Sequence, residues 1–478
     1  MKGELNVVVV GAGIGGLGTA LALSRAGHRV TLVERDDTPV PQDAEDAFEW
    51  NRRGAPQLQH PHAFLGLART ILRDRFPDVL DALAGIGVHA VPLGPGLREH
   101  MVPDVLDALT LDDDLQLLAC RRTTFEWVMR QRVIDQANLT LQLGVGVAGV
   151  TVDSSADGAP VVTGVELEDG SVLAADLVVA STGRRGDVPR WLGVHGIDVP
   201  ETNTETGVVY FSRFYQSDHS EDFGFRAGMG AGLMAGVIGA DAGTYSITAV
   251  VDQNDRELRA HLSDSDRFDA TMWLLPELAD VAAADGKPLN DVHCMTGLVN
   301  RHRRYTDAEG NPSVIGLIAC GDAHTCTNPA YGRGMSLALL QATFIADALV
   351  AHDDLESVAR QYEAESTRLV EPWYHYSVRS DRMRRSLLDP ISHPASPEDN
   401  AESGGYNLIG ILARHSDNVE LIRAALRVLH LLEPPQTLTD RLPEIEAEIA
   451  AVPPERLQPS TSPGRPQPTR DELLAAVG

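Results

Sequence analysis

Three glycines near the start of the chain have the spacing of a dinucleotide-binding turn. Gly11, Gly13 and Gly16 form a GxGxxG motif between a β-branched run, Val7–Val10, and an Ala- and Leu-rich segment with helical character. In such a motif the first glycine permits a tight turn, the second lets the backbone approach a pyrophosphate, and the third allows close helix–strand packing. The helix N-terminus adds unpaired N–H groups and a partial positive charge. The motif therefore predicts a pyrophosphate site.

An acidic residue follows at the distance that a ribose-binding role requires. A second predicted strand, Arg29–Val33, ends at Glu34 and Arg35, and Glu34 lies 23 residues after Gly11. A carboxylate at this position accepts hydrogen bonds from a ribose diol. Arg35, beside it, is a further cofactor-binding candidate. These residues predict a bound dinucleotide but do not distinguish FAD from NAD.

A second candidate segment lies about 310 residues further along the chain. The apolar strand Ser313–Ala319 runs into Gly-Asp322, then Pro329, and an Ala- and Leu-rich helix starts with Gly-Arg-Gly-Met at 332–335. This order resembles the flavoprotein monooxygenases of the para-hydroxybenzoate hydroxylase superfamily. The resemblance implies that the dinucleotide is FAD and that Asp322 bonds its ribityl chain. It also implies that backbone N–H groups meet the flavin N1–C2=O edge, from Gly332, Gly334 and Met335.

Two more segments match that superfamily. The strand Leu115–Cys120 precedes a helix that starts with two arginines, and the family pattern favours Arg122 over Arg121 as the one that lies along FAD. Another strand ends at Thr182-Gly183, where most hydroxylases of the superfamily have Asp-Gly, a pair that they link to both FAD and NAD(P)H. The resemblance therefore leaves two electron sources open, direct reduction by NAD(P)H or a partner flavin reductase.

One stretch resembles a subgroup that includes the bacterial polyether epoxidases. It comprises Asn-Arg-Arg-Gly-Ala-Pro-Gln at 51–57, His60-Pro-His62, and Gly-Val-Val-Tyr-Phe-Ser-Arg at 207–213. In that subgroup the Arg-Gly-x-Pro-Gln segment passes beside the isoalloxazine, which makes Arg53 a cofactor-binding candidate. A solvated surface pair explains Arg52 and Arg53 equally well, and the two histidines also fit loop residues with satisfied hydrogen bonds.

The pattern of predicted elements indicates an α/β fold. We expect a Rossmann-like FAD-binding domain made of residues 1–75, 115–190 and 300–350. Residues 76–114 and 191–299 form the predicted substrate domain, in which alternating runs such as Gly207–Tyr215 and Thr244–Asp252 indicate an antiparallel sheet. Residues 351–478 form a C-terminal helical region with a Pro-rich tail, and Thr469 to Glu472 has capping-box spacing for a terminal helix.

Composition excludes several function classes. The net charge of −28 and pI near 4.9 argue against nucleic acid or anionic lipid as a partner. We expect no membrane span, since no run of about 18 apolar residues occurs. The N-terminus enters a strand without the order of a signal peptide, which favours a cytoplasmic protein. The four cysteines contain no CxxC pair, so neither a disulfide framework nor a metal site is expected.

The family resemblance implies an FAD-dependent monooxygenase that hydroxylates or epoxidises a hydrophobic small molecule, as in secondary metabolism. In that family, O₂ reacts with reduced flavin to give a C4a-hydroperoxide, so few catalytic side chains are needed, and none is assigned here. An FAD-dependent reductase or dehydrogenase of a prenyl-type substrate is the alternative, and a non-catalytic FAD-binding protein is another. A flavin halogenase is disfavoured, because its chemistry uses a lysine and a WxWxIP segment, whereas the only lysines are Lys2 and Lys287.

Overall fold

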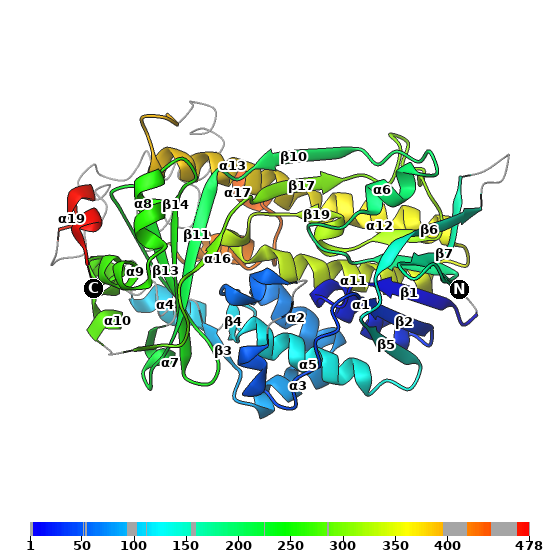
Figure 1. Ribbon diagram of the computed structural model, residues 1–478, viewed down its shortest axis with the longest axis horizontal. Coiled ribbons are helices and arrows are strands. Elements are labelled where there is room, and N and C mark those ends of the chain that lie inside the picture. The colour runs from blue at the N-terminus through cyan, green and yellow to red at the C-terminus, as the bar shows by residue number, and fades with distance from the viewer. Residues whose placement is uncertain are drawn as a thin grey trace.

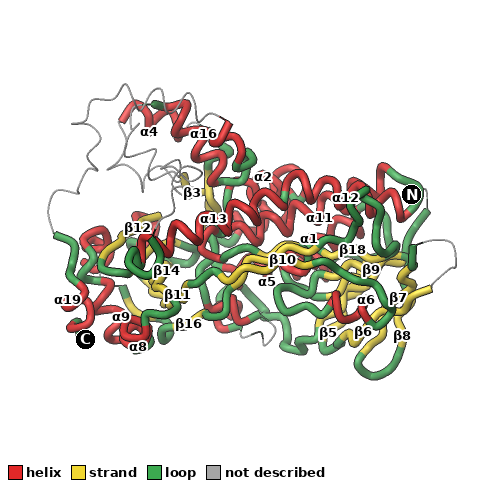
Figure 2. Tube along the Cα trace, turned by 90° about the horizontal axis from the view of Figure 1, so that it is seen from above, coloured by secondary structure: helices red, strands yellow, loops and turns green. Residues whose placement is uncertain are grey.

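The computed structural model describes residues 3–50, 52, 55–92, 103–110, 112–153, 159–223, 225–283, 286–394, 418–440 and 466–477. Figure 1 shows an elongated molecule with a parallel sheet toward one end and a large antiparallel sheet toward the other. Long helices run along the length of the molecule (Figure 2).

A five-stranded parallel sheet forms the first structural centre. Its strand order is β18-β9-β1-β2-β5, and all four pairings are parallel. The strands are β1 (Asn6–Val10), β2 (Arg29–Glu34), β5 (Leu139–Leu143), β9 (Leu177–Ala180) and β18 (Leu317–Ala319). Four residues of β1 are buried, as expected for a β-branched strand covered on both faces. The strands predicted from the sequence at β1, β2, β9 and β18 are confirmed. No strand is predicted from the sequence at β5.

Helices cover one face of this sheet. They are α1 (Ile14–Arg25), α2 (Gly66–Arg75), α3 (Pro77–Gly85), α5 (Arg122–Ile134) and α11 (Arg333–Ala351). Their apolar side chains share one core with β1, including Val7, Leu17, Leu83 and Leu339. Because Leu83 belongs to α3, part of the segment 76–114 packs against the parallel sheet. The division into domains stays a prediction.

The opposite face of the parallel sheet carries a second layer. A three-stranded antiparallel sheet, β6-β7-β8, packs there with the short helix α6. The bounds are β6 (Val147–Asp153), β7 (Val161–Leu167), β8 (Val172–Ala174) and α6 (Val188–Gly193). The parallel sheet is therefore buried on both faces, which leaves its edges and strand ends as the accessible sites.

The large antiparallel sheet forms the second centre. Its order is β12-β13-β14-β11-β15, and β16 also pairs with β11. The strands are β11 (Val208–Gln216), β12 (Phe225–Gly230), β13 (Leu233–Gly239), β14 (Thr244–Asp252), β15 (Lys287–Pro288) and β16 (His293–Met295). One face packs on α8 (Arg256–Leu262), α9 (Ser265–Met272) and α10 (Ala279–Ala283), through a core that includes Phe211, Ile247 and Phe268. The predicted strands at 207–215 and 244–252 are confirmed.

Smaller sheets and helices connect the two centres. The sheet β10-β17-β19 consists of β10 (Glu201–Glu205), β17 (Val299–Arg303) and β19 (Thr325–Cys326), and the pair β3-β4 consists of β3 (His89–Pro92) and β4 (Gln116–Ala119). Short helices are α4 (Pro103–Thr110) and α7 (Ser220–Phe223). The edge strand β10 pairs with β17 along its whole length, and Figure 1 shows both lying along the connection between the two ends of the molecule.

The C-terminal part is helical. Its described helices are α12 (Leu355–Leu369), α13 (Glu371–Leu388), α16 (Val419–Leu429), α17 (Gln436–Asp440) and α19 (Arg470–Ala475). Figure 2 shows α11, α12 and α13 along the length of the molecule. The predicted capping box is present: Thr469 and Glu472 bond each other's backbone N–H groups. The sequence pattern also predicts helices at about 405–432 and 436–451, and parts of both lie outside the described residues.

Only α11 is long and apolar enough to cross a membrane, among the residues that the structure describes. However, 67% of its apolar window is buried inside the molecule. The helix packs on α1 and α12 and contributes Leu339 and Ile345 to the main core. This burial is typical of a core helix.

Candidate functional site

The first glycine-rich turn has the geometry that its sequence predicts. Gly11 has φ +98°, a conformation that favours glycine, and its N–H donates to the Val33 carbonyl at 2.8 Å. A Cβ on Gly16 would lie 1.8 Å from the Gly11 carbonyl oxygen, so helix α1 rests directly on the turn. At Gly13 a Cβ would meet no protein atom within 4 Å. Gly13 is also the N-cap of α1, and no side chain caps that helix end.

Glu34 lies at the end of β2 and is buried. Its Oε2 accepts hydrogen bonds from the Ala12 N–H at 2.9 Å and from Arg52 at 2.7 Å, and its Oε1 accepts from the Asp36 N–H at 3.1 Å. The carboxylate is thus fixed against the glycine-rich turn. A carboxylate has about four lone-pair directions, so one remains for a further donor such as a ribose hydroxyl.

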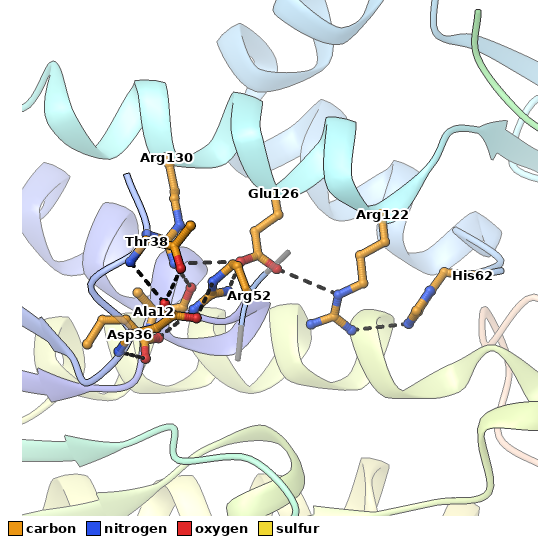
Figure 3. A network of polar contacts seen from close by, with 9 residues as sticks. Ala12, Asp36, Thr38, Arg52, His62, Arg122, Glu126 and Arg130 are labelled. Carbon is orange, nitrogen blue, oxygen red and sulfur yellow. Dashed lines mark hydrogen bonds and ion pairs between the residues drawn. The ribbon is translucent and has the colours of Figure 1, made fainter. Parts of the chain in front are cut away.

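Three arginines surround one fully buried carboxylate, that of Glu126 (Figure 3). Arg52 bonds Glu126 directly, and the guanidinium groups of Arg122 and Arg130 each lie 3.6 Å from it. Residues 122, 126 and 130 follow each other at i, i+4 spacing on α5, which places them on one helix face. Sequence reasoning missed Glu126 and Arg130, and this spacing is the signal that would have identified them.

The arginines stay charged despite their burial. Burial and the neighbouring Arg52 lower the pKa of Arg130 to about 10. Burial also opposes the charge of Arg52, but Glu126, Glu34 and Asp36 outweigh it and raise its pKa. Arg130 donates to the Ala12 carbonyl at 3.1 Å, so this charge network touches the glycine-rich turn. Its three arginines are matched by the carboxylates of Glu126, Glu34 and Asp36. The positive charge offered to a diphosphate at this turn is therefore that of the α1 N-terminus.

The ring of Trp50 holds two of these arginines in place. The guanidinium carbons of Arg130 and Arg52 lie 4.9 and 5.5 Å from its ring centroid, at cation–π distance. Of the two arginines weighed in the 51–57 stretch, Arg52 is therefore an interior residue and not part of a solvated surface pair. Arg53 lies outside the described residues, so its predicted role is not tested. Arg35 is exposed just after β2.

The two arginines at the start of α5 face different partners. Arg121 binds Asp241 of the antiparallel sheet region through Nε at 3.1 Å and a terminal nitrogen at 2.7 Å. Arg122 instead donates to His62 Nε2 at 3.2 Å, and His62 Nδ1 lies 2.8 Å from the His60 carbonyl. Because burial and Arg122 lower the pKa of His62 well below its usual range, this imidazole is neutral and accepts from Arg122. Arg122 thus belongs to the network around Glu126, whereas Arg121 contacts the antiparallel sheet region.

The second candidate segment forms a turn between β18 and α11. It includes the 3₁₀ segments Gly321–Ala323 and Pro329–Tyr331. Asp322 is half-buried, and one of its carboxylate oxygens lies 3.8 Å from the position of a Cβ on Gly334. Burial raises the pKa of Asp322, while nearby Arg122, Arg184 and Arg301 act in the opposite direction. The Asp322 carboxylate is therefore close enough to Arg122 for their charges to interact. Arg122 also contacts Glu126, so it links Asp322 to the network beside the glycine-rich turn.

Helix α11 starts without a side-chain cap. Its N-cap is Gly332, whose φ of 65° lies in the left-handed region. Gly334, in the first turn, is exposed, whereas Met335 is buried. Such a helix N-terminus attracts negative charge. Pro329 lies at the start of the exposed 3₁₀ turn just before it.

Helix α13 fixes this turn from behind. Asp381 accepts hydrogen bonds from Asn328 at 2.6 Å, from Asn300 at 2.6 Å and from the Tyr331 hydroxyl at 3.0 Å. Asn328 in turn bonds the Ala330 N–H at 3.0 Å. No motif points to Asp381, because the residues that donate to it lie 50 or more positions away in the chain.

The two segments lie at the same edge of the parallel sheet. β1 and β18 flank β9, and their carboxyl ends lead into the glycine-rich turn and into Asp322 respectively. A Cβ on Gly15 would lie 3.5 Å from the Cys320 sulfur, so α1 and the second segment are in contact. Two uncapped helix starts, a fixed carboxylate and a buried arginine cluster thus meet at one place. Their donor set fits FAD, whose diphosphate and flavin edge both need N–H donors and positive charge.

The loop at Thr182-Gly183 is tightly closed. Gly183 has φ +69°, and a Cβ on Gly186 would lie 1.8 Å from Thr182 Oγ1. The Thr182 hydroxyl is buried without a hydrogen-bond partner among the described residues. The source of electrons is not tested by this arrangement.

Within the described residues, no group of three or more His, Cys, Asp or Glu side chains is arranged to hold a metal ion. The four cysteines are free thiols, of which Cys294 is exposed.

Comparisons with known proteins support an FAD-linked fold. A family model described as FAD dependent oxidoreductase matches residues 6–45, the segment that contains the glycine-rich turn and Glu34. Protein Rv3254 of Mycobacterium tuberculosis is 28% identical over 428 residues, which make up 81% of this chain and 82% of that protein. An FAD-dependent monooxygenase of Aspergillus terreus is 24% identical over 380 residues, 75% of this chain and 81% of its own.

A solved structure has the same architecture. The crystal structure of pqsL, a probable FAD-dependent monooxygenase from Pseudomonas aeruginosa, superimposes with a TM-score of 0.60 at 17% identity, over 81% of this chain and 97% of that one. The chain therefore has the predicted α/β fold, with a Rossmann-like core, antiparallel sheets and C-terminal helices. The resemblance to the polyether epoxidase subgroup is not confirmed by these comparisons.

Proposed function

We propose that the chain is an FAD-dependent monooxygenase that hydroxylates or epoxidises a hydrophobic small molecule. The observation that carries this proposal is the meeting of two uncapped helix N-termini, those of α1 and α11, at one edge of the parallel sheet. One is suited to a diphosphate and the other to the electron-rich edge of a flavin. Such a pair is what an extended flavin dinucleotide requires.

Each candidate residue has a role in this proposal. Gly11, Gly13 and Gly16 shape the turn that the diphosphate crosses. Glu34 holds the adenosine ribose, with Arg35 beside it. These assignments use the geometry of the described residues, in which the turn is open at Gly13 and Glu34 keeps one free lone-pair direction.

The remaining candidates hold the flavin half. Arg122 lies along the cofactor, oriented by Glu126 and His62. Asp322 binds the ribityl chain, and the first turn of α11 after Pro329 donates N–H groups to the flavin, from Gly332, Gly334 and Met335. We keep Arg53 as a candidate at the isoalloxazine. When bound and reduced, FAD supplies the chemistry that activates O₂; the chain's own residues bind, orient and exclude water.

The antiparallel sheet supports a hydrophobic substrate. On the face opposite α8 and α9, it carries half-buried apolar side chains, including Met234, Ile238 and Val250. This face joins the α11 turn directly, since Tyr210 of β11 donates to Asn328 at 2.7 Å. A substrate on this face would lie between the sheet and the flavin edge.

The flavin needs a source of electrons. We infer either NAD(P)H acting directly or a partner flavin reductase. Rapid mixing of the oxidised holoprotein with NADH or NADPH tests this point. Fast bleaching of the flavin without a second protein supports direct reduction, and unchanged absorbance supports a reductase.

The test of the reaction itself uses oxygen isotopes. Purified protein is loaded with FAD, reduced without air and mixed with ¹⁸O₂ and a panel of apolar aromatic and alkene compounds. The expected result is a product that contains one ¹⁸O atom, as an alcohol or phenol for hydroxylation and as an epoxide for epoxidation. Reduction or dehydrogenation of a prenyl-type compound without ¹⁸O would instead support the alternative function. FAD binding without turnover of any compound would count against both.

A further inference from the structure

The face of the antiparallel sheet that points toward the α11 turn carries one row of polar side chains beside one row of mostly apolar side chains. On β11, Val209, Phe211 and Tyr215 belong to the core beneath α8 and α9, so the alternate residues point the other way. The strand register aligns these alternate residues in rows across the sheet. One row contains Ser212, Thr248 and His293; its neighbour contains Tyr210, Val250, Met234 and Met295.

A histidine from outside the sheet rests on the polar row. His60 Nδ1 lies 3.0 Å from Ser212 Oγ, and Ser212 Oγ lies 2.9 Å from Thr248 Oγ1. The ring of His293 lies 6.5 Å from that of His60, centroid to centroid. His60 is only 8% exposed, yet its Nε2 makes no hydrogen bond to any described residue. The imidazole is thus held at one nitrogen and free at the other.

The segment that carries His60 also touches the start of α11. A Cβ on Gly332 would lie 2.8 Å from the Cβ of Ala63, three residues after His60. His62, between them, accepts a hydrogen bond from Arg122. The segment 60–63 therefore spans from the polar row of the sheet to the proposed flavin edge, and the apolar side chains of the neighbouring row lie alongside.

We propose that His60 orients the substrate, which is an apolar molecule that carries a hydroxyl group, by a hydrogen bond between its free Nε2 and that hydroxyl. This inference rests on the proposed function, because it places the substrate between the sheet and the flavin. A hydroxyl both donates and accepts, so it pairs with either tautomer of His60. The apolar part of the substrate then lies against Met234 and Val250.

His60 orients the hydroxyl and does not remove its proton. Burial and the neighbouring His293 lower the pKa of His60 to about 4. An imidazole this weakly basic is a poor match for a phenol or alcohol proton, since general-base catalysis works best with a pKa near the working pH. Burial and the nearby Arg122 likewise lower the pKa of His62, so His62 is neutral too. His60 is therefore a substrate-positioning residue with a neutral hydrogen bond.

The test compares two probes that differ only in a hydroxyl, 2-naphthol and naphthalene. Their binding to the oxidised FAD-loaded protein is followed by the change in flavin absorbance, without turnover. We expect wild-type protein to bind 2-naphthol about tenfold more tightly than naphthalene, which is near the upper end for a neutral hydrogen bond. His60→Phe is expected to abolish this preference. His60→Gln, whose side-chain amide reaches the position of Nε2, is expected to restore part of it.

Two further variants separate positioning from packing. Ser212→Ala keeps His60 but frees its Nδ1, so the preference is expected to fall about threefold. His195→Phe is the matched control, because His195 bonds the Val150 carbonyl in the layer behind the parallel sheet. This variant is expected to prefer 2-naphthol over naphthalene as strongly as the wild-type protein does. The FAD content of each variant is measured first.

The outcomes decide the two proposals separately. Wild-type protein that binds both probes equally, or binds neither, overturns the inference, and so does an undiminished preference in His60→Phe with full FAD content. Absence of FAD binding in wild-type protein refutes the proposed function instead. In that case the probes are titrated by tryptophan fluorescence, and the same comparison of His60 variants still decides the role of His60.

Discussion

Replacement of Gly13 by alanine separates cofactor binding from folding. At Gly13 an added Cβ would meet no protein atom within 4 Å, and its backbone angles, φ −80° and ψ −175°, suit any residue. Only the loss of a favourable N-cap residue is expected, about 0.5–1 kcal/mol. If the diphosphate crosses this glycine, however, the methyl group would stand in its path. We therefore expect FAD to bind at least tenfold more weakly, a loss of about 1.4 kcal/mol.

Gly16→Ala provides the matched contrast. Its Cβ would lie 1.8 Å from the Gly11 carbonyl oxygen, whereas real Cβ contacts essentially never fall below 3.0 Å. Helix and turn would have to separate by about 1.2 Å, and no flexible side chain can absorb this shift. Overpacking of this kind costs roughly 1–3 kcal/mol. The apoprotein itself should therefore be destabilised by Gly16→Ala.

The assay has two parts for each variant. Urea unfolding of the apoprotein, followed by circular dichroism, gives the midpoint, and quenching of flavin fluorescence gives the FAD dissociation constant. The expected pattern is a near-normal midpoint with weak FAD binding for Gly13→Ala, and a lowered midpoint for Gly16→Ala. Wild-type FAD affinity in Gly13→Ala would refute the placement of the diphosphate at this turn.

Two other predictions concern Asp322 and His430. Asp322→Ala is expected to weaken FAD binding about tenfold or more, since a hydrogen bond to a charged group contributes roughly 1.5–3 kcal/mol. The control is Asp307→Ala, in an exposed loop, which should leave FAD binding unchanged. Equal FAD retention in both variants would count against the role of Asp322. Burial lowers the pKa of His430 to about 4, whereas the pKa of a histidine in the unfolded chain is near 6.5. Below pH 6.5 the unfolded state therefore binds more protons than the folded state. The free energy of unfolding then falls as the pH drops toward 4, by on the order of 3 kcal/mol from this group. His430→Asn keeps an acceptor for the Gly66 N–H and should reduce the pH dependence of the urea midpoint between pH 6.5 and 4. An unchanged pH dependence would contradict this reasoning.

The main elements of the candidate site could be predicted because they depend on neighbours in the chain. The turn at Gly11, the helix after it, and the carboxylate at the end of β2 form one continuous strand–helix–strand unit. The positive φ of Gly332 before α11 and the capping box at Thr469 are local in the same way. Short-range periodicity and glycine positions encode such features directly.

The choice between adjacent residues needed the tertiary structure. Arg52 is buried because Glu34, Glu126 and Trp50 converge on it from three separate elements. Arg121 turns to Asp241, which leaves Arg122 facing the proposed cofactor path. No local pattern could assign the carboxylate partners, because Glu34, Glu126 and Asp241 lie between 18 and 120 residues away from the arginines that they bind.

The sequence by itself determined that a dinucleotide turn and a second glycine-rich helix start exist, since both follow from short-range steric and hydrogen-bonding rules. Only the tertiary structure decided that they meet at one sheet edge, around a buried arginine cluster, with His60 resting on a polar row of the second sheet. Those contacts join segments that are far apart in the chain. Their geometry is fixed by the packing of whole elements, and local residue preferences carry no information about it.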